Sequence, residues 1–152
     1  ALVLCYRDEY KQTLGEKRGD FHVMLVHEWL PLALQQTAAR EASGEPWYLF
    51  AHCTEVTALP GAPAQWAAIF ARFGAKLENV SVGCCGMAGT YGHEVKNHAN
   101  SLGIYELSWQ QAMQRLPRNR CLATGYSCRS QVKRVEGSGV RHPLQALLEI
   151  IG

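Results

Sequence analysis

Two adjacent cysteines, Cys84 and Cys85, lie inside a glycine-rich segment, Gly83–Gly92, with the sequence GCCGMAGTYG. Side chains of neighbouring residues normally point apart, so two sulfur atoms serve one centre only where the backbone turns sharply. Glycine allows such turns because it has no Cβ, and it lets backbone N–H groups approach a bound anion or sulfide. The segment indicates either a thiol-based binding site or a tight loop with a vicinal disulfide or two buried cysteines.

The composition is typical of a soluble globular protein with one hydrophobic core. The chain has 152 residues, of which 47% are hydrophobic and 18% charged, which argues against disorder. The formal net charge is only +2, and the basic residues form isolated pairs, so we expect no nucleic-acid partner. The apolar stretch 21–34 is broken by Pro31 and by charged and polar residues, so we expect no membrane span.

The cysteine content and the first residue suggest the cellular setting. Six cysteines are few for a disulfide scaffold of this size, so we expect reduced thiols that act as ligands. Such thiols indicate a cytoplasmic protein, at most peripheral at the inner face of the membrane. The chain starts at Ala1 in an apolar run, without an initiator methionine or an export signal, so we expect a piece of a longer chain.

Short apolar runs alternate with helical patterns along the chain. This alternation predicts an α/β fold, with a parallel sheet covered by helices on both faces in a Rossmann-like three-layer arrangement. The four tryptophans fall on apolar faces, so we expect them in the core. The expected helices are 20–40, bent at Pro31, 64–73, 93–103, 108–116, 129–135 and 144–151, and the expected strands are 47–51, 77–82, 121–124 and 140–141.

Four cysteines follow expected strands. Cys53 comes after the first strand, Cys84 and Cys85 after the second, and Cys128 after the third. Ligands of open parallel sheets bind outside the carboxyl ends of the strands, so the sequence predicts a shared metal or cluster site at the C-terminal ends of the strands. Cys5 and Cys121 are left over and are expected to be buried structural residues.

Several neighbours of these cysteines are candidates for supporting roles. We expect Cys128 just before a helix, where the helix dipole and the cation of Arg129 favour the thiolate. His52 and Glu55 flank Cys53 and either orient it, ligate zinc themselves or simply pack in the loop. His93 is a candidate hydrogen-bond donor or proton relay, with a solvent-facing role as the alternative. The remaining candidates are the backbone N–H groups of the loop glycines, Gly83 and Gly86.

Three segments, 52–55, 83–92 and 124–131, resemble the cysteine-rich CCG domain of heterodisulfide reductase subunits and of iron–sulfur subunits that serve glycolate and glycerol-3-phosphate oxidation. Segments 89–94 and 141–145 are most similar to the C-terminal end of large bacterial D-2-hydroxy acid dehydrogenases, FAD-linked oxidases that contain FAD and iron–sulfur clusters. Residues 4–10 resemble the end of a preceding copy. The resemblance implies that residues 1–45 are a remnant of that copy plus a linking helix, and that residues 46–152 are a CCG domain.

The resemblance also implies a ligand set. Cys53, Cys84, Cys85 and Cys128 match ligands of the CCG pattern, whereas Gly125 stands where the fullest pattern has a fifth cysteine. Four thiolates suit one 4Fe-4S cluster or a zinc ion. No residue is assigned a catalytic role, and we expect this chain alone to turn over no substrate.

The function implied is electron transfer within a flavin-dependent 2-hydroxy acid oxidoreductase. Electrons would pass from reduced FAD, held with the first CCG copy in the rest of the same polypeptide, through an iron–sulfur cluster to an acceptor such as a quinone or a redox protein. One alternative is a structural zinc-binding or interdomain module without a redox role. The other is thiol catalysis, in which Cys84 and Cys85 cycle through a strained disulfide.

Overall fold

The computed structural model describes residues 2–152 and divides between Thr37 and Ala38 into two compact units. The predicted helix 20–40 is wrong except for α3, which contains Pro31, because residues 20–25 and 34–40 are not in this helix. Residues before α3 are irregular, and Arg7 Nε donates to Val23 O at 2.8 Å there. Trp29 on α3 is 53% exposed, so its predicted core position is also wrong. The elements of the first unit are α1 (Leu2–Arg7), α2 (Glu9–Leu14), a 3-10 helix (Gly15–Arg18) and α3 (Val26–Ala33).

A three-stranded parallel sheet organises the second unit and confirms the predicted α/β fold. Its strands are β1 (Trp47–Phe50), β2 (Leu77–Asn79) and β3 (Cys121–Ala123), in the order β2-β1-β3. Leu49 pairs with Asn79 on one side and with Leu122 on the other. β2 ends earlier than the predicted 77–82, although Val80 N still donates to Leu49 O at 2.9 Å. The predicted strand 140–141 is reduced to one parallel bridge between Leu122 and Arg141.

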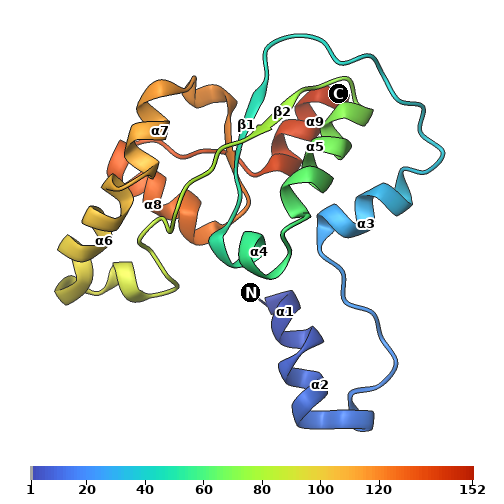
Figure 1. Ribbon diagram of the computed structural model, residues 1–152, viewed down its shortest axis with the longest axis horizontal. Helices are drawn as coiled ribbons and strands as arrows, with labels where there is room; N and C mark the ends of the chain where they lie inside the picture. The colour runs from blue at the N-terminus through green and yellow to red at the C-terminus, as the bar shows by residue number, and fades with distance from the viewer. Residues whose placement is uncertain (1) are drawn as a thin grey trace. The chain divides into compact units, whose positions relative to one another are not determined.

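Helices lie on both sides of this sheet (Figure 1). α5 and α9 lie on one side, and α6, α7 and α8 lie on the other. The predicted helix 93–103 starts late, because residues 91–97 form two 3-10 turns instead, and α4 was not predicted. Among residues 2–152, no helix combines the length and apolar character needed to cross a membrane. The helices are α4 (Cys53–Ala58), α5 (Ala62–Arg72), α6 (His98–Glu106), α7 (Trp109–Arg115), α8 (Tyr126–Glu136) and α9 (Pro143–Ile151).

The core follows the two-residue alternation of the strands. Phe50, Cys121 and Ala123 face one apolar cluster, which also takes in Trp109 and Val132 from the helices. Leu49 and Leu122 are fully buried and point to the opposite face, because successive strand residues alternate between faces. The predicted core positions of the other three tryptophans are confirmed, since Trp47, Trp66 and Trp109 are all buried. The predicted domain boundary at residue 45 stays a prediction.

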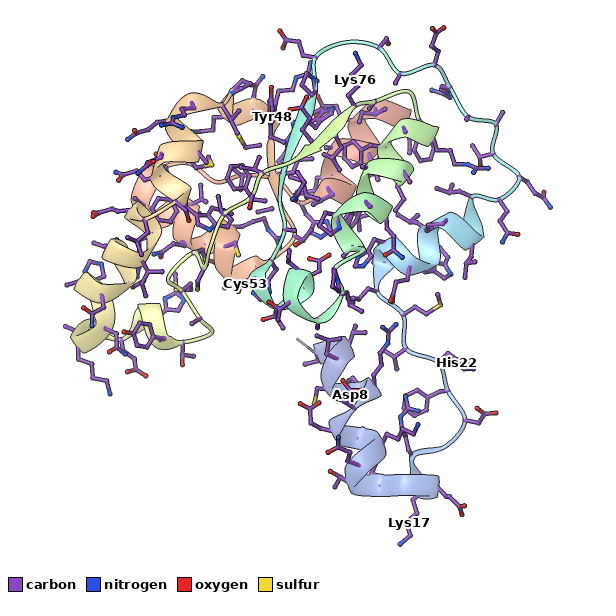
Figure 2. The ribbon with its side chains drawn as sticks, viewed as in Figure 1. Asp8, Lys17, His22, Tyr48, Cys53 and Lys76 are labelled. Atoms are coloured by element: carbon purple, nitrogen blue, oxygen red, sulfur yellow. The ribbon has the colours of Figure 1, made fainter. Side chains whose placement is uncertain are left out.

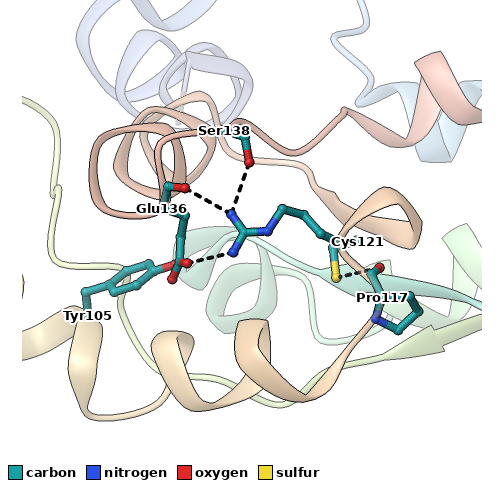
Figure 3. A network of polar contacts seen from close by, with 6 residues as sticks. Tyr105, Pro117, Cys121, Glu136 and Ser138 are labelled. Atoms are coloured by element: carbon teal, nitrogen blue, oxygen red, sulfur yellow. Dashed lines mark hydrogen bonds and ion pairs between the residues drawn. The ribbon is translucent and has the colours of Figure 1, made fainter.

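A polar network closes the end of the α6–α8 side (Figure 3). Tyr105, which is fully buried, donates its hydroxyl to Glu136 Oε1 at 3.1 Å. Arg118 Nη2 donates to Glu136 Oε2 at 2.6 Å, and its Nη1 donates to Ser138 Oγ at 3.2 Å. Burial and the neighbouring carboxylate raise the pKa of Tyr105. The network ties α6, the segment before β3 and the end of α8 together.

This network predicts two unequal losses of stability. Tyr105→Phe should lower the free energy of unfolding by about 1 kcal/mol, because Glu136 keeps its arginine partner. Arg118→Met should cost about 2 kcal/mol, because the largely buried Glu136 carboxylate then lacks its cation. Urea unfolding followed by circular dichroism measures both. A larger loss for Tyr105→Phe than for Arg118→Met would contradict this account.

Candidate functional site

The carboxyl ends of β1 and β3 lead directly into cysteine-bearing helices. Figure 2 shows Cys53 at the start of α4, at the end of the sheet opposite Lys76. Cys128 lies in the first turn of α8, so this helix begins earlier than the predicted 129–135. Cys84 and Cys85 follow β2 in an extended segment without regular secondary structure. The parallel strands therefore direct three connections to one edge of the sheet.

The four thiols influence one another's ionisation in two pairs. Cys128 lowers the pKa of Cys85, and Cys53 adds to the effect of burial that raises the pKa of Cys84. All six cysteines of the chain are free thiols. Cys85 and Cys128 belong to the apolar core cluster and are 3% and 1% exposed.

The pKa values of Cys85 and Cys128 shift in opposite directions. The Cys128 S–H lowers the pKa of Cys85, and the backbone N–H groups of Met87 and Ala88 lower it further. The interaction with Cys85 and burial raise the pKa of Cys128, and the thiolate predicted at Cys128 stays a prediction. Arg129 does not reverse these shifts, because its guanidinium donates to the carbonyl oxygens of Ala123 and Thr124, at 2.9 and 3.0 Å.

Backbone geometry explains the two glycines beside the double cysteine. Gly86 has a φ of +85°, and a Cβ there would lie 2.1 Å from the carbonyl oxygen of Ser101 on α6. Its N–H donates to Cys84 Sγ at 3.4 Å. The N–H of Gly83 donates to Ser108 Oγ at 3.0 Å, and its carbonyl accepts from Trp109 Nε1 at 2.9 Å. Gly86 thus supplies a donor to sulfur, whereas Gly83 anchors the loop to α7.

Three side chains that sequence reasoning missed hold the far end of the glycine-rich loop. Gln131 Nε2 donates to Ser101 Oγ at 3.1 Å, and both residues are fully buried. Arg134 Nη2 donates to the same hydroxyl at 2.9 Å, and its Nη1 donates to the carbonyl of Gly92. Gln131 and Arg134 lie one turn and two turns beyond Cys128 on α8, and this helical spacing is the one signal that could have indicated them.

The structure places the three predicted supporting side chains, His52, Glu55 and His93, in different surroundings. The backbone N–H of His52 donates to Thr124 Oγ1 at 2.9 Å, and burial lowers the pKa of its imidazole. Thr124 donates its hydroxyl to Glu55, which also accepts from Trp66 Nε1 at 3.3 Å. His52 and Glu55 therefore both contact Thr124, and these polar contacts join the carboxyl ends of β1 and β3. His93 is exposed, and within residues 2–152 its side chain makes no hydrogen bond to the cysteines.

Gly125 leaves the space that the His52 ring fills. A Cβ at position 125 would lie 2.3 Å from His52 Cδ2 and 2.8 Å from Cys128 Sγ. Contacts below 3.0 Å require a neighbour to move, so no side chain fits at 125 while the imidazole stays in place. The imidazole of His52 thus closes the space beside Cys128 that a side chain at position 125 would occupy.

The donor set fits a thiolate-bound centre in its chemistry, but the side chains are not gathered into one group. Four cysteines follow the three strands, and backbone N–H groups interact with the sulfur atoms of Cys84 and Cys85, as around iron–sulfur clusters and zinc–thiolate sites. In the part of the chain that the structure describes, no three histidine, cysteine or acidic side chains form a group that could hold a metal ion.

Comparison with curated proteins finds similarity to D-2-hydroxyglutarate dehydrogenases. The chain is 83% identical over 151 residues to the enzyme of Escherichia coli K12, and 76% identical over 151 residues to that of Pantoea ananatis. It is 52% identical over 159 residues to that of Haemophilus influenzae. Each alignment covers 99% of this chain but only 15 or 16% of the relative, so the chain spans about a sixth of their length.

No protein-family model matches the chain, and no solved structure matches it. The relatives confirm the likeness to D-2-hydroxy acid dehydrogenases.

Because a side chain at position 125 would collide with the His52 ring, a larger residue there should destabilise the protein. Gly125→Ala should lower the free energy of unfolding of the metal-free protein by about 1–3 kcal/mol, the usual cost of overpacking. His52→Gly makes room for the new methyl group, so the double variant should be more stable than the sum of the two single losses implies. Urea unfolding of the four proteins measures this coupling.

Gly103→Ala is the matched control, because a Cβ at this position on α6 meets nothing within 4 Å. It should stabilise the protein by about 0.5–1 kcal/mol, since alanine favours a helix interior over glycine. If the losses of unfolding free energy in Gly125→Ala and His52→Gly simply add in the double variant, the claim that the His52 ring occupies the space beside Gly125 is contradicted.

Proposed function

We propose that this chain is an iron–sulfur electron-transfer part of a flavin-dependent D-2-hydroxy acid oxidoreductase, with D-2-hydroxyglutarate as the substrate of the whole protein. The names of the relatives and the high identity over nearly all of this chain support the oxidoreductase assignment. Because the chain spans about a sixth of these relatives, we assign the substrate site and FAD to the rest of the polypeptide. This chain alone is then not catalytic.

The arrival of cysteines after all three strands of one parallel sheet, Cys53 after β1, Cys84 and Cys85 after β2 and Cys128 after β3, is the observation that carries the proposal. Four thiolates are the usual ligand set of a 4Fe-4S cluster. We infer that these four cysteines are the ligands. Cys85 is the thiol most ready to ionise, because donors already surround its sulfur.

In the proposed reaction, the substrate gives up two electrons together, whereas an iron–sulfur cluster passes electrons on one at a time. Oxidation of a 2-hydroxy acid to a 2-oxo acid removes two electrons and two protons, which a flavin takes up together. A bound iron–sulfur cluster would supply one-electron transfer from the reduced flavin to an acceptor such as a quinone or a redox protein. The protein's own contribution is to bury Cys85 and Cys128, to exclude water from them and to direct N–H groups at sulfur.

The remaining parts of the proposal follow from the resemblance to CCG domains. We propose that residues 46–152 form one such domain and that residues 1–45 include the end of a preceding copy. The partners would then be the FAD part and the first copy in the same polypeptide. We propose a cytoplasmic location, at most peripheral at the inner membrane face if the acceptor is a quinone.

A structural zinc site is the second candidate, because the same four thiolates suit tetrahedral zinc. A zinc site would hold the sheet edge together without a redox role, as part of an interdomain module. The two candidates differ in sulfide content and in redox activity, since zinc has no accessible second oxidation state and brings no sulfide.

Anaerobic reconstitution with iron and sulfide tests the proposal. We expect about four irons and four acid-labile sulfides per chain, and an EPR signal after reduction. Cys84→Ser with Cys85→Ser should abolish loading, because both thiol pairs are broken. Iron, zinc and sulfide analysis together with EPR provide the readout.

Cys121→Ala is the matched control, because this buried cysteine lies at the amino end of β3, away from the thiol edge, and contacts Pro117 O. It should load as much iron as the unchanged chain. Stoichiometric zinc without iron or sulfide would favour the structural module, and unchanged iron loading in the Cys84 and Cys85 variant would refute the ligand assignment.

A further inference from the structure

The two adjacent cysteines have different surroundings. Cys84 is half-buried, whereas Cys85 is only 3% exposed and belongs to the apolar core cluster together with Met87. Gly86 separates these two core residues, and its φ of +85° lies in the left-handed region, where the backbone turns. To reach solvent, Cys85 must leave the cluster, which requires the backbone at Gly86 to move.

Ser101 on α6 lies against both ends of the loop that follows the cysteines. Its carbonyl oxygen is so close to Gly86 that a Cβ at position 86 would lie 2.1 Å from it. Its hydroxyl oxygen would lie 2.7 Å from a Cβ at Gly92, and the N–H of Gly92 donates to Met87 O at 2.9 Å. One fully buried serine thus closes the loop 86–92 against α6.

Two side chains of α8 hold Ser101 and the loop together. Gln131 Nε2 donates to the carbonyl oxygen of Ser101 at 3.2 Å and to its hydroxyl oxygen at 3.1 Å. Arg134 Nη2 donates to the same hydroxyl at 2.9 Å, and Arg134 Nη1 donates to the carbonyl of Gly92. Hydrogen bonds from a charged donor are stronger than those between neutral groups, so we expect Arg134 to contribute most to holding the loop.

The backbone of the loop does not favour this conformation by itself. Ala88 has a φ of +39°, in the left-handed region that residues with a Cβ rarely adopt. Such a conformation persists only where surrounding contacts hold it. The contacts of Ser101 and Arg134 with the loop are of this kind, so they, rather than the local sequence, fix the loop.

We propose that Ser101, held by Gln131 and Arg134, is a positioning residue that controls access to the two adjacent thiols. While the loop is closed on Ser101, a thiophilic metal ion or an electrophile reaches Cys84 and not Cys85. Cys85 becomes accessible only when the loop leaves α6. This role belongs to the metal-free protein and goes beyond the proposed function, because it does not depend on a bound cluster.

Alkylation of the metal-free chain with iodoacetamide tests this role, and tandem mass spectrometry locates the label on Cys84 or Cys85. The thiolate displaces iodide from the reagent, and the thiol proton passes to the buffer. Ser101→Ala and Arg134→Met should each raise the alkylation rate of Cys85 about tenfold, because each removes a hydrogen bond that holds the loop closed. The rate of Cys84 should stay the same.

Cys121 distinguishes opening of the loop from a general loss of stability. This thiol is buried in β3, so its alkylation rate reports opening of the sheet. A faster reaction of Cys85 with an unchanged rate at Cys121 supports the role of Ser101. Equal acceleration of both thiols, or an unchanged rate at Cys85 in both variants, would overturn it.

Lys133→Met is the matched control, because it removes a neighbouring cation on the same helix. Lys133 is exposed, and in the part of the chain that the structure describes its ammonium group forms no hydrogen bond or ion pair. The control should leave the rates of Cys85 and Cys121 unchanged, and a faster Cys85 in this variant would overturn the assignment to Arg134. A chain that loads no iron would refute the proposed function and leave the labelling result standing.

Discussion

The parallel pairing of three short strands is the constraint on which the site depends. β1 lies between β2 and β3, so the carboxyl ends of all three strands meet at one edge, and each connection delivers cysteines there. Side chains reinforce this edge, because Thr124 at the end of β3 accepts from the His52 backbone N–H and donates to Glu55 on α4. Without this register the two thiol pairs would not form.

The thiol edge and the hydrophobic core are continuous. Cys85 and Cys128 belong to the same cluster as Phe50 and Trp109, and the tilted Phe50 and Trp109 rings lie 4.9 Å apart. Burial opposes ionisation of a thiol, and local donors outweigh the burial effect at Cys85 but not at Cys128. Two neighbouring thiols with opposite pKa shifts result, so one S–H is shared within the pair. A bound centre that takes both sulfurs as thiolates must displace this proton.

The sequence predicted the sheet, because the strands depend on local patterns, whereas the shared site of the four cysteines stays a prediction. The aromatic and apolar run 47–50 and the apolar run 121–123 are strands, and the cysteines follow them. Other features depend on competing effects. The expected helix 20–40 forms only over α3, and α4 escaped prediction because Thr54, Val56 and Thr57 are β-branched and have low helix propensity.

Contacts between distant segments could not be predicted in this way. Gln131 and Arg134 hold the glycine-rich loop through Ser101, a residue on another helix, and nothing local in the sequence pairs them. The contact of His52 Nε2 with Ser127 Oγ at 3.4 Å likewise joins residues 75 positions apart in the sequence.

A crystal structure of the anaerobically loaded chain, with anomalous diffraction at the iron edge, tests the central claim most directly. The account predicts anomalous density at the carboxyl edge of the sheet, bonded to the sulfur atoms of Cys53, Cys84, Cys85 and Cys128. Iron bound elsewhere, or a cluster at this edge that lacks Cys53 or Cys128 as a ligand, would contradict it.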